Sequence, residues 1–170
     1  MTGDTQAGKT SLHRMVLFFL RHAEAERDAE TDFARKLTSK GVDQAEKAGK
    51  FLLRLGIVPD VILTSPLVRA RQTAKIVADR LGDMEATEVP WLAAGMAPET
   101  YLREIQEYSK NESVMVVGHE PDFSETIAYL LGLPDPDALK IRKTTLTAIQ
   151  LGEIEPGKAQ LQFLVPARLM

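Results

Sequence analysis

The chain has 170 residues, 44% hydrophobic and 26% charged, which is long enough for one globular domain with a buried core and short for two. Its formal net charge of -3 excludes a general electrostatic attraction to nucleic acid or to an anionic membrane. The absence of cysteine excludes disulfides, thiolate zinc sites and a cysteine nucleophile.

The N-terminal segment is polar and has no apolar period, so residues 1–13 are expected to be a flexible leader or the remnant of an expression tag. The folded domain is expected to span residues 14–170. Within the leader, Gly3–Thr10 matches the phosphate-binding pattern G-x-x-x-x-G-K-[ST] letter for letter. That pattern binds nucleotide phosphates where a strand leads into it and a helix follows it. Because two residues precede the match and a strand-like run follows it, we interpret it as accidental.

Apolar periodicity predicts that strands and helices alternate from Met15 onward. The first strand is expected over 16–20. A helix capped by Thr38 follows and ends near Leu55, where Gly56 comes next. The predicted inward stripe of this helix consists of Val42, Ala45, Ala48, Leu52 and Leu55.

The rest of the chain continues the alternation. A short strand over 61–63 precedes Ser65 and Pro66, which predict the cap and first turn of a helix ending at Gly82. The later elements are expected as a weak strand over 85–89, a helix over 98–109, a strand over 113–117, a helix from Pro121 to about Gly132, and a hairpin of strands 145–151 and 160–164 at an antiparallel edge. This order predicts an α/β fold: a single three-layer α/β/α domain whose mostly parallel sheet has helices on both faces.

Two of the predicted strands lead directly into a histidine. Arg21 and His22 follow the apolar run 16–20, and His119 closely follows the run 114–117. Ligands of open α/β sheets bind beyond the C-terminal ends of the strands. Cationic and imidazole groups gathered there would bind a phosphoryl group, and a neutral imidazole nitrogen can attack phosphorus. His22 is the better candidate nucleophile, although each histidine taken alone is also typical of an ordinary loop or capping residue.

The helix that follows Ser65 adds two arginines near its N-terminus, Arg69 and Arg71. The free N–H groups and the dipole at a helix N-terminus also favour an anion. Helical spacing puts the two arginines on opposite flanks of the apolar stripe, so it does not tell which of them faces the site. Both also fit the ordinary role of solvated charges on an amphipathic helix.

Four groups of residues carry a resemblance to a known family. They are Leu20–Glu26, then Arg35–Thr38 with Gly41 and Gln44–Ala45, then Ser65–Ala74, then Val117–Asp122. Taken in this order, over residues 15 to 151, they resemble the histidine phosphatase superfamily and within it the small SixA-type phosphohistidine phosphatases. Lys36 departs from the pattern, because similar proteins often have proline there.

The resemblance implies a phosphoglycerate mutase-like fold that requires no metal or other cofactor. It implies that His22 is the nucleophile that becomes transiently phosphorylated, and that Arg21, Arg69 and His119 bind the phosphoryl oxygens. It thereby selects Arg69 over Arg71.

The segment 85–98 is too short to form a lid, and an open site would admit a phosphorylated side chain of another protein. We therefore predict a phosphatase that acts on phosphohistidine in a protein, such as a phosphotransfer or phosphocarrier domain, and releases inorganic phosphate. Moving a phosphoryl group from one imidazole to another exchanges similar P–N bonds, which makes little demand on a general acid. No nucleic-acid or membrane partner is expected. No apolar run approaches the ~20 residues of a membrane span, so a cytoplasmic location is expected.

An acid remains a candidate, and so do two other functions. Glu120 directly follows the second histidine, where some acid-phosphatase branches keep a carboxylate, and Glu24 and Glu99 are alternatives; all three also fit solvated surface residues. The first alternative function is a phosphatase of small phosphate esters, such as sugar phosphates, that uses the same residues. The second is a phosphate- or phosphohistidine-binding module without turnover.

Overall fold

The computed structural model describes residues 14–170, so the predicted leader and the Gly3–Thr10 match lie outside the described residues. Six strands of the described part form one mixed sheet with the order β3-β2-β4-β1-β5-β6. The strands are β1 (Met15–Arg21), β2 (Val61–Thr64), β3 (Ala86–Glu88), β4 (Ser113–Gly118), β5 (Leu146–Leu151) and β6 (Ala159–Val165). The α-helices are α1 (Ser39–Arg54), α2 (Val68–Arg80), α3 (Pro98–Ile105) and α4 (Asp122–Leu131).

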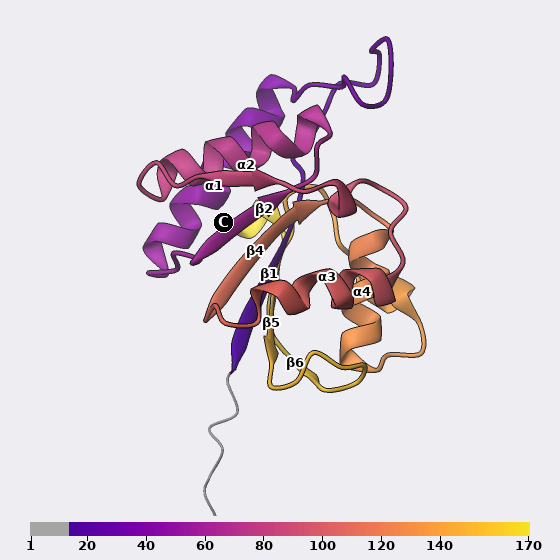
Figure 1. Ribbon diagram of the computed structural model, residues 1–170. Helices are drawn as coiled ribbons and strands as arrows, with labels where there is room; N and C mark the ends of the chain where they lie inside the picture. The colour runs from indigo at the N-terminus through magenta and orange to yellow at the C-terminus, as the bar shows by residue number, and fades with distance from the viewer. Residues whose placement is uncertain (1–13) are drawn as a thin grey trace, which may run out of the picture.

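Most of the sheet is parallel. Strands β3, β2, β4 and β1 run in the same direction, whereas β5 pairs antiparallel with β1 and β6 antiparallel with β5. Helices α1 and α2 pack together on one face of the sheet, and α3 and α4 pack together on the other (Figure 1). The predicted three-layer α/β fold and the terminal antiparallel hairpin are confirmed.

Strand β1 is buried on both faces, which explains its uninterrupted apolar sequence. Successive side chains of a strand point to opposite faces, so a strand covered by helices on both sides needs apolar residues at every position. On the α3–α4 side the core includes Leu17, Phe19, Tyr101 and Phe123. On the α1–α2 side it includes Phe18, Leu20, Leu52 and Val77. The sheet edge reached by β1 is therefore fixed by packing from both layers.

The register of the central strands brings three chain segments to one edge. Leu20 of β1 lies opposite Val117 of β4, and Val117 also lies opposite Thr64 of β2. The residues that follow these strands, among them His22 and His119, therefore start from the same level of the sheet.

Three predicted details are wrong. Val42 and Leu55 of the predicted inward stripe are 40% and 48% exposed, because Leu55 is already the C-terminal cap and Val42 borders a surface groove. Helix α2 begins at Val68 with Leu67 as its N-cap, so Ser65 and Pro66 precede the helix instead of starting it. Helix α3 ends at Ile105, and 106–108 continue as a 3-10 turn.

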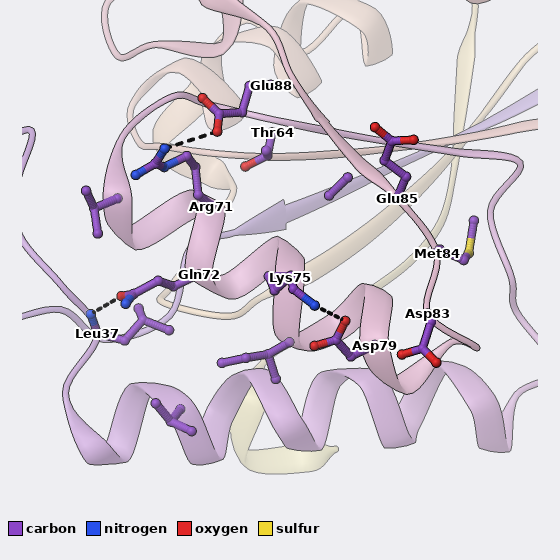
Figure 2. Close-up of a pocket in the computed structure, with 14 residues that line it drawn as sticks. Leu37, Thr64, Arg71, Gln72, Lys75, Asp79, Asp83, Met84, Glu85 and Glu88 are labelled. Carbon is purple, nitrogen blue, oxygen red and sulfur yellow. Dashed lines mark hydrogen bonds and ion pairs between the residues drawn. The ribbon is translucent and has the colours of Figure 1, made fainter.

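The groove beside α2 has a volume of about 720 Å³ and lies against the β3 edge of the sheet (Figure 2). Its apolar lining includes Leu37, Val42, Val68, Ile76 and Met84. Salt bridges from Arg71 to Glu88 and from Lys75 to Asp79 cross its polar side. His22 and His119 do not line this groove, so it is separate from the histidine-bearing edge. In residues 14–170 no helix is both long and apolar enough to cross a bilayer.

The N-terminus of α1 is packed tightly against the chain that leaves β1. Thr38 caps the helix as predicted, since its Oγ1 accepts a hydrogen bond from the Gly41 backbone N at 3.1 Å. Thr38 N in turn donates to the Glu24 backbone O at 3.1 Å. A Cβ built on Gly41 would lie 2.0 Å from that same Glu24 oxygen. The helix thus approaches the histidine-bearing segment more closely than any side chain at position 41 permits.

We predict that Gly41→Ala lowers the free energy of unfolding by about 1–3 kcal/mol, the usual cost of overpacking. The overlap is with a backbone oxygen that cannot move away alone, which outweighs the gain of about 1 kcal/mol in helix propensity. Urea unfolding measures the change. The matched control is Gly152→Ala, where a Cβ meets nothing within 4 Å. Equal unfolding midpoints for the two variants would contradict this account of the packing.

Candidate active site

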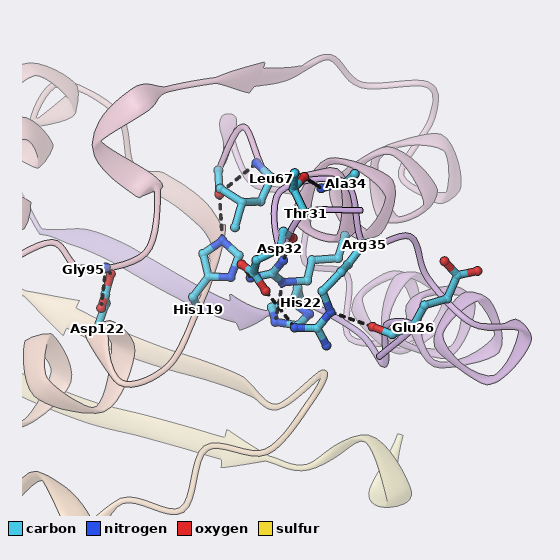
Figure 3. A network of polar contacts seen from close by, with 12 residues as sticks. His22, Glu26, Thr31, Asp32, Ala34, Arg35, Leu67, Gly95, His119 and Asp122 are labelled. Carbon is cyan, nitrogen blue, oxygen red and sulfur yellow. Dashed lines mark hydrogen bonds and ion pairs between the residues drawn. The ribbon is translucent and has the colours of Figure 1, made fainter. Parts of the chain in front are cut away.

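Two histidines, which directly follow β1 and β4, meet at the sheet edge (Figure 3), and Arg69 of α2 contacts one of them. His22, His119 and Arg69 are 4%, 2% and 5% exposed. The two imidazole centroids are 5.1 Å apart, and Arg69 Nε donates to His22 Nε2 at 3.3 Å. Arg21 precedes His22 and is close enough for its charge to lower the pKa of His119. The structure therefore brings together the four residues predicted from the sequence.

The hydrogen bonds of His22 define which of its nitrogens is free to react. Nδ1 lies 2.8 Å from the backbone O of Ala23, which accepts but cannot donate, so Nδ1 carries the hydrogen. Nε2 therefore keeps its lone pair and accepts from Arg69. The ring is held by the backbone around it, since His22 N donates to Gly118 O at 3.0 Å and Ala23 N donates to Thr73 Oγ1 at 3.0 Å.

Both imidazoles are neutral at ordinary pH. Burial lowers the pKa of His22 to about 2, and the charges of Lys143 and Arg69 act in the same direction. Burial also lowers the pKa of His119 to about 4, with Arg69 as the next cause. Because neither ring is protonated near pH 7, no proton occupies the lone pair of His22 Nε2 at that pH.

Two buried nitrogens of the site have no hydrogen-bond partner within the part of the chain that the structure describes. They are His119 Nδ1 and Arg21 Nε. A buried polar atom without a partner is costly, and such atoms are uncommon in folded proteins. Arg21 Nε–H would donate to an oxygen of a phosphoryl group bound beside His22. His119 Nδ1 would donate to another in the tautomer in which Ser65 Oγ donates to Nε2.

Ser65 positions the second imidazole. His119 Nε2 and Ser65 Oγ form a hydrogen bond of 2.8 Å, and the same Oγ accepts from Leu67 N at 3.2 Å. Because Leu67 N fixes the position of Ser65 Oγ, this oxygen orients the His119 ring through Nε2. Nδ1 then has no hydrogen-bond partner within residues 14–170. The sequence predicted Ser65 as a helix cap; its contact with a residue 54 positions away gave no local signal.

Asp32 sets the direction of Arg69. Arg69 donates to the Asp32 backbone O at 2.7 Å and to its Oδ2 at 3.0 Å, while Arg35 donates to Oδ1 at 2.9 Å. The hydrogen bonds from Arg35 and Arg69 lower the pKa of Asp32 and keep it charged. Two of the three guanidinium nitrogens of Arg69 are thus held by one residue, and Nε is aimed at His22. Arg71, the other candidate, points elsewhere and pairs with Glu88 at 3.1 Å.

The candidate acids differ in their surroundings. Glu120 is half-buried, its Oε1 accepts from Ser124 N at 3.1 Å, and burial raises its pKa while the charge of Arg21 lowers it. Glu24 pairs with Lys40 at 2.8 Å, and Glu99 is exposed in the first turn of α3. Of the three, Glu120 therefore has the environment that best suits a proton donor.

The short segment ahead of α3 is tied down beside the site. The buried carboxylate of Asp122 accepts from the backbone N of Gly95 at 2.9 Å and of Met96 at 3.0 Å (Figure 3). Gly95 and Met96, in the region 85–98 predicted to be too short for a lid, are thus pinned to the start of α4.

The sequence and the fold are both similar to those of known phosphatases. A family model of the histidine phosphatase superfamily (branch 1) matches residues 17–93. The phosphohistidine phosphatase SixA homolog of Haemophilus influenzae is 35% identical over 133 residues, covering 72% of this chain and 80% of that protein. Phosphohistidine phosphatase SixA of Escherichia coli is 32% identical over 124 residues, covering 68% and 74%.

Solved structures give the same picture. The structure of the protein histidine phosphatase SixA complexed with tungstate has a TM-score of 0.82 at 25% identity and covers 91% of this chain and 98% of that one. A putative alpha-ribazole-5'-P phosphatase from Escherichia coli has a TM-score of 0.73 at 20% identity, covering 90% and 97%, which is a likeness of fold.

The burial of the two imidazoles predicts an unusual titration. The ring C–H signals of His22 and His119 in NMR spectra are expected to stay constant from about pH 5 to about pH 8, whereas an unperturbed histidine titrates near pH 6.5. Spectra of His22→Ala and His119→Ala assign the signals. The protein is also expected to become less stable at low pH. Below about pH 6.5 the two histidines bind protons in the unfolded state but not in the folded state, so the free energy of unfolding decreases as the pH decreases. A midpoint near 6.5 for either ring would contradict the burial of that imidazole.

Proposed function

Because the chain belongs to the histidine phosphatase superfamily, we propose that it removes a phosphoryl group from phosphohistidine on a protein through a covalent phospho-His22 intermediate. One observation carries the proposal: a buried, neutral His22 with its Nε2 lone pair facing Arg69, next to two buried nitrogens that lack partners among the described residues. That arrangement combines a nucleophile with donors for the oxygens of the group it attacks.

The first step transfers the phosphoryl group to the protein. Nε2 of His22 attacks phosphorus as the P–N bond to the substrate ring breaks. The substrate ring carries a proton on its other nitrogen and leaves as a neutral imidazole, so its positive charge passes to His22. Arg69 Nε–H exchanges its hydrogen-bond acceptor, His22 Nε2, for a phosphoryl oxygen, and the Nε2 lone pair can then attack. Arg21 Nε and His119 Nδ1 donate to further oxygens. The positive charge left on the His22 ring is stabilised by the Ala23 carbonyl at Nδ1.

The second step returns the enzyme to its starting state. Water attacks the phosphorus of phospho-His22, the P–Nε2 bond breaks, and inorganic phosphate leaves. The same donors that held the oxygens in the first step serve the second, so no rearrangement of Arg69 and its Asp32 partner is needed between the two.

A protein phosphohistidine as substrate is supported by the short segment before α3 and by the chemistry. The segment 85–98 is short, and Gly95 and Met96 in it are tied to Asp122, which favours a site that admits a side chain presented by another protein, such as a phosphotransfer or phosphocarrier domain. Exchange of one imidazole for another requires little help from an acid. The relatives in Haemophilus influenzae and Escherichia coli bear the name phosphohistidine phosphatase, which supports the same substrate class.

A second candidate function is hydrolysis of small phosphate esters on the same residues. The observation that favours it is Glu120, whose raised pKa suits protonation of an alkoxide leaving group. A binding module without turnover is the third candidate, and its weakness is that it gives the Nε2 lone pair of His22 no role beyond accepting from Arg69.

Acid-quench labelling with a ³²P-labelled phosphohistidine protein tests the intermediate. Wild type is expected to acquire an acid-labile, base-stable label, and His22→Ala is expected to acquire none, because the attacking nitrogen is gone. Arg71→Met is the control, since Arg71 lies on the far flank of α2 and should label like wild type. Label of equal amount in His22→Ala would assign the nucleophile to another residue, and no label in wild type would favour the binding module.

Relative turnover of two substrate classes tests the specificity. We expect kcat/KM for a phosphohistidine protein to exceed that for a panel of sugar phosphates by about 10²-fold or more, the scale of a missing general acid. Glu120→Gln is expected to reduce the residual ester turnover and to leave the phosphohistidine reaction nearly unchanged. A preference for the sugar phosphates would reverse the ranking of the two functions.

A further inference from the structure

A strained turn lies directly on the backbone of Arg21, the last residue of β1, and of His22, which follows it. Thr144 is buried and has a φ of 57°, in the left-handed region that residues other than glycine rarely adopt. Its backbone N donates to the Arg21 carbonyl at 3.1 Å and, less closely, to the His22 carbonyl at 3.4 Å. Thr145 N closes the turn on the Arg142 carbonyl at 2.9 Å. Strain of this kind persists where surrounding contacts impose it, and it is concentrated at functional sites.

The turn presents Lys143 to the site. This lysine is half-buried, and within residues 14–170 no hydrogen bond or salt bridge ties its ammonium to another residue. The charge of Lys143 lowers the pKa of His22 more than His119 or Arg69 lowers it, although Arg69 is in direct contact with the His22 ring. Of the charged side chains around His22, Lys143 therefore acts on that ring most strongly.

The neighbours of Lys143 are mostly cations. Arg21 from β1, Arg35 from the segment before α1 and Arg69 from α2 all repel it, and the neutral rings of His22 and His119 lie in range of its charge. The acid that faces it, Glu24, is already paired with Lys40 at 2.8 Å. Arg35 and Arg69 share the single carboxylate of Asp32, so the four cations outnumber the acids paired with them. A cluster of excess positive charge is stabilised by an anion, and the reaction proposed for this site brings a phosphoryl dianion to it.

We propose that Lys143 is a fourth phosphoryl-binding residue, whose ammonium donates to an oxygen of the phosphoryl group beside His22. This adds a residue to the set that the family resemblance assigned, Arg21, Arg69 and His119. The inference rests on the proposed function, because a phosphoryl group must occupy the site for Lys143 to bind it.

The role has a consequence for pH. Burial, followed by the repulsion of Arg21, Arg35 and Arg69, lowers the pKa of Lys143 to about 8. The ammonium is therefore charged below about pH 8 and neutral above it. The two histidines titrate far lower, and Glu24 stays ionised because Lys40 lowers its pKa. Binding of an anion should weaken as pH rises through about 8, and kcat/KM should fall over the same interval because it reports the free enzyme.

Tungstate is the probe for binding, because it keeps its two negative charges across the neutral and mildly alkaline range and needs no turnover. Its affinity for wild type is expected to fall about 10-fold from about pH 7 to about pH 9, as a group with a pKa of about 8 loses its proton. Lys143→Met is expected to bind about 10-fold more weakly at pH 7, the effect of losing one charge-assisted hydrogen bond, and to show no further decline. Lys143→Arg should bind like wild type at pH 7 and keep its affinity at pH 9.

Arg142→Met is the matched control, because Arg142 is the exposed cation next to Lys143 on the same turn, and it should follow wild type at every pH. Wild-type affinity and decline in Lys143→Met would overturn the proposal. Equal losses in Lys143→Arg and Lys143→Met would overturn the role of the charge. Tungstate binding that depends on Lys143 without any phosphoenzyme would refute the proposed function alone, whereas a phosphoenzyme formed equally well by Lys143→Met would refute this inference alone.

Discussion

The hydrogen bond from His22 Nδ1 to the carbonyl of its own neighbour, Ala23, is the contact on which the rest of the site depends. It directs the other nitrogen, Nε2, toward Arg69 and fixes which nitrogen carries the proton. Burial and the surrounding cations then hold the ring neutral, with a pKa of about 2. A ring that stays neutral keeps its lone pair among positive charges, and of these charges only Arg69 is paired with an acid of the described residues, Asp32. An anion that enters the site therefore meets an excess of positive charge.

The fold maintains this contact through strand register. Arg21 lies opposite Gly118, and His22 N donates to the Gly118 carbonyl one step beyond the paired strands. Because β1 is packed on both faces, it cannot slip by one residue without moving every core side chain to the wrong layer. The register that buries Phe18 and Phe19 in opposite layers therefore also sets the separation of the two imidazoles.

Sequence patterns predicted the parts of the site that follow regular elements. Arg21, His22 and His119 come directly after buried strands, so their position at one edge followed from topology. Helical spacing alone could not separate Arg69 from Arg71, since both flank the same stripe; the family resemblance did, and the structure agrees. Asp32, Ser65 and Lys143 were missed because each acts across a large sequence separation from a segment without periodicity. The prediction of Ser65 as the helix cap was wrong because the backbone of Leu67 is extended, so α2 begins only at Val68.

The site is built at some expense to stability, and two of its three costs share one remedy. Within residues 14–170 two buried nitrogens lack partners, Thr144 holds a strained backbone, and Lys143 is surrounded by arginines. Contacts with other residues hold the groups of the site in place. Ser65 holds His119, Asp32 holds Arg69, and the carbonyls of Arg21 and His22 accept from Thr144 N. A dianion with three oxygens relieves the unpartnered nitrogens and the repulsion together. Donors arranged in advance need not reorganise as charge shifts between oxygens, which is the condition for stabilising the transition state more than the bound substrate.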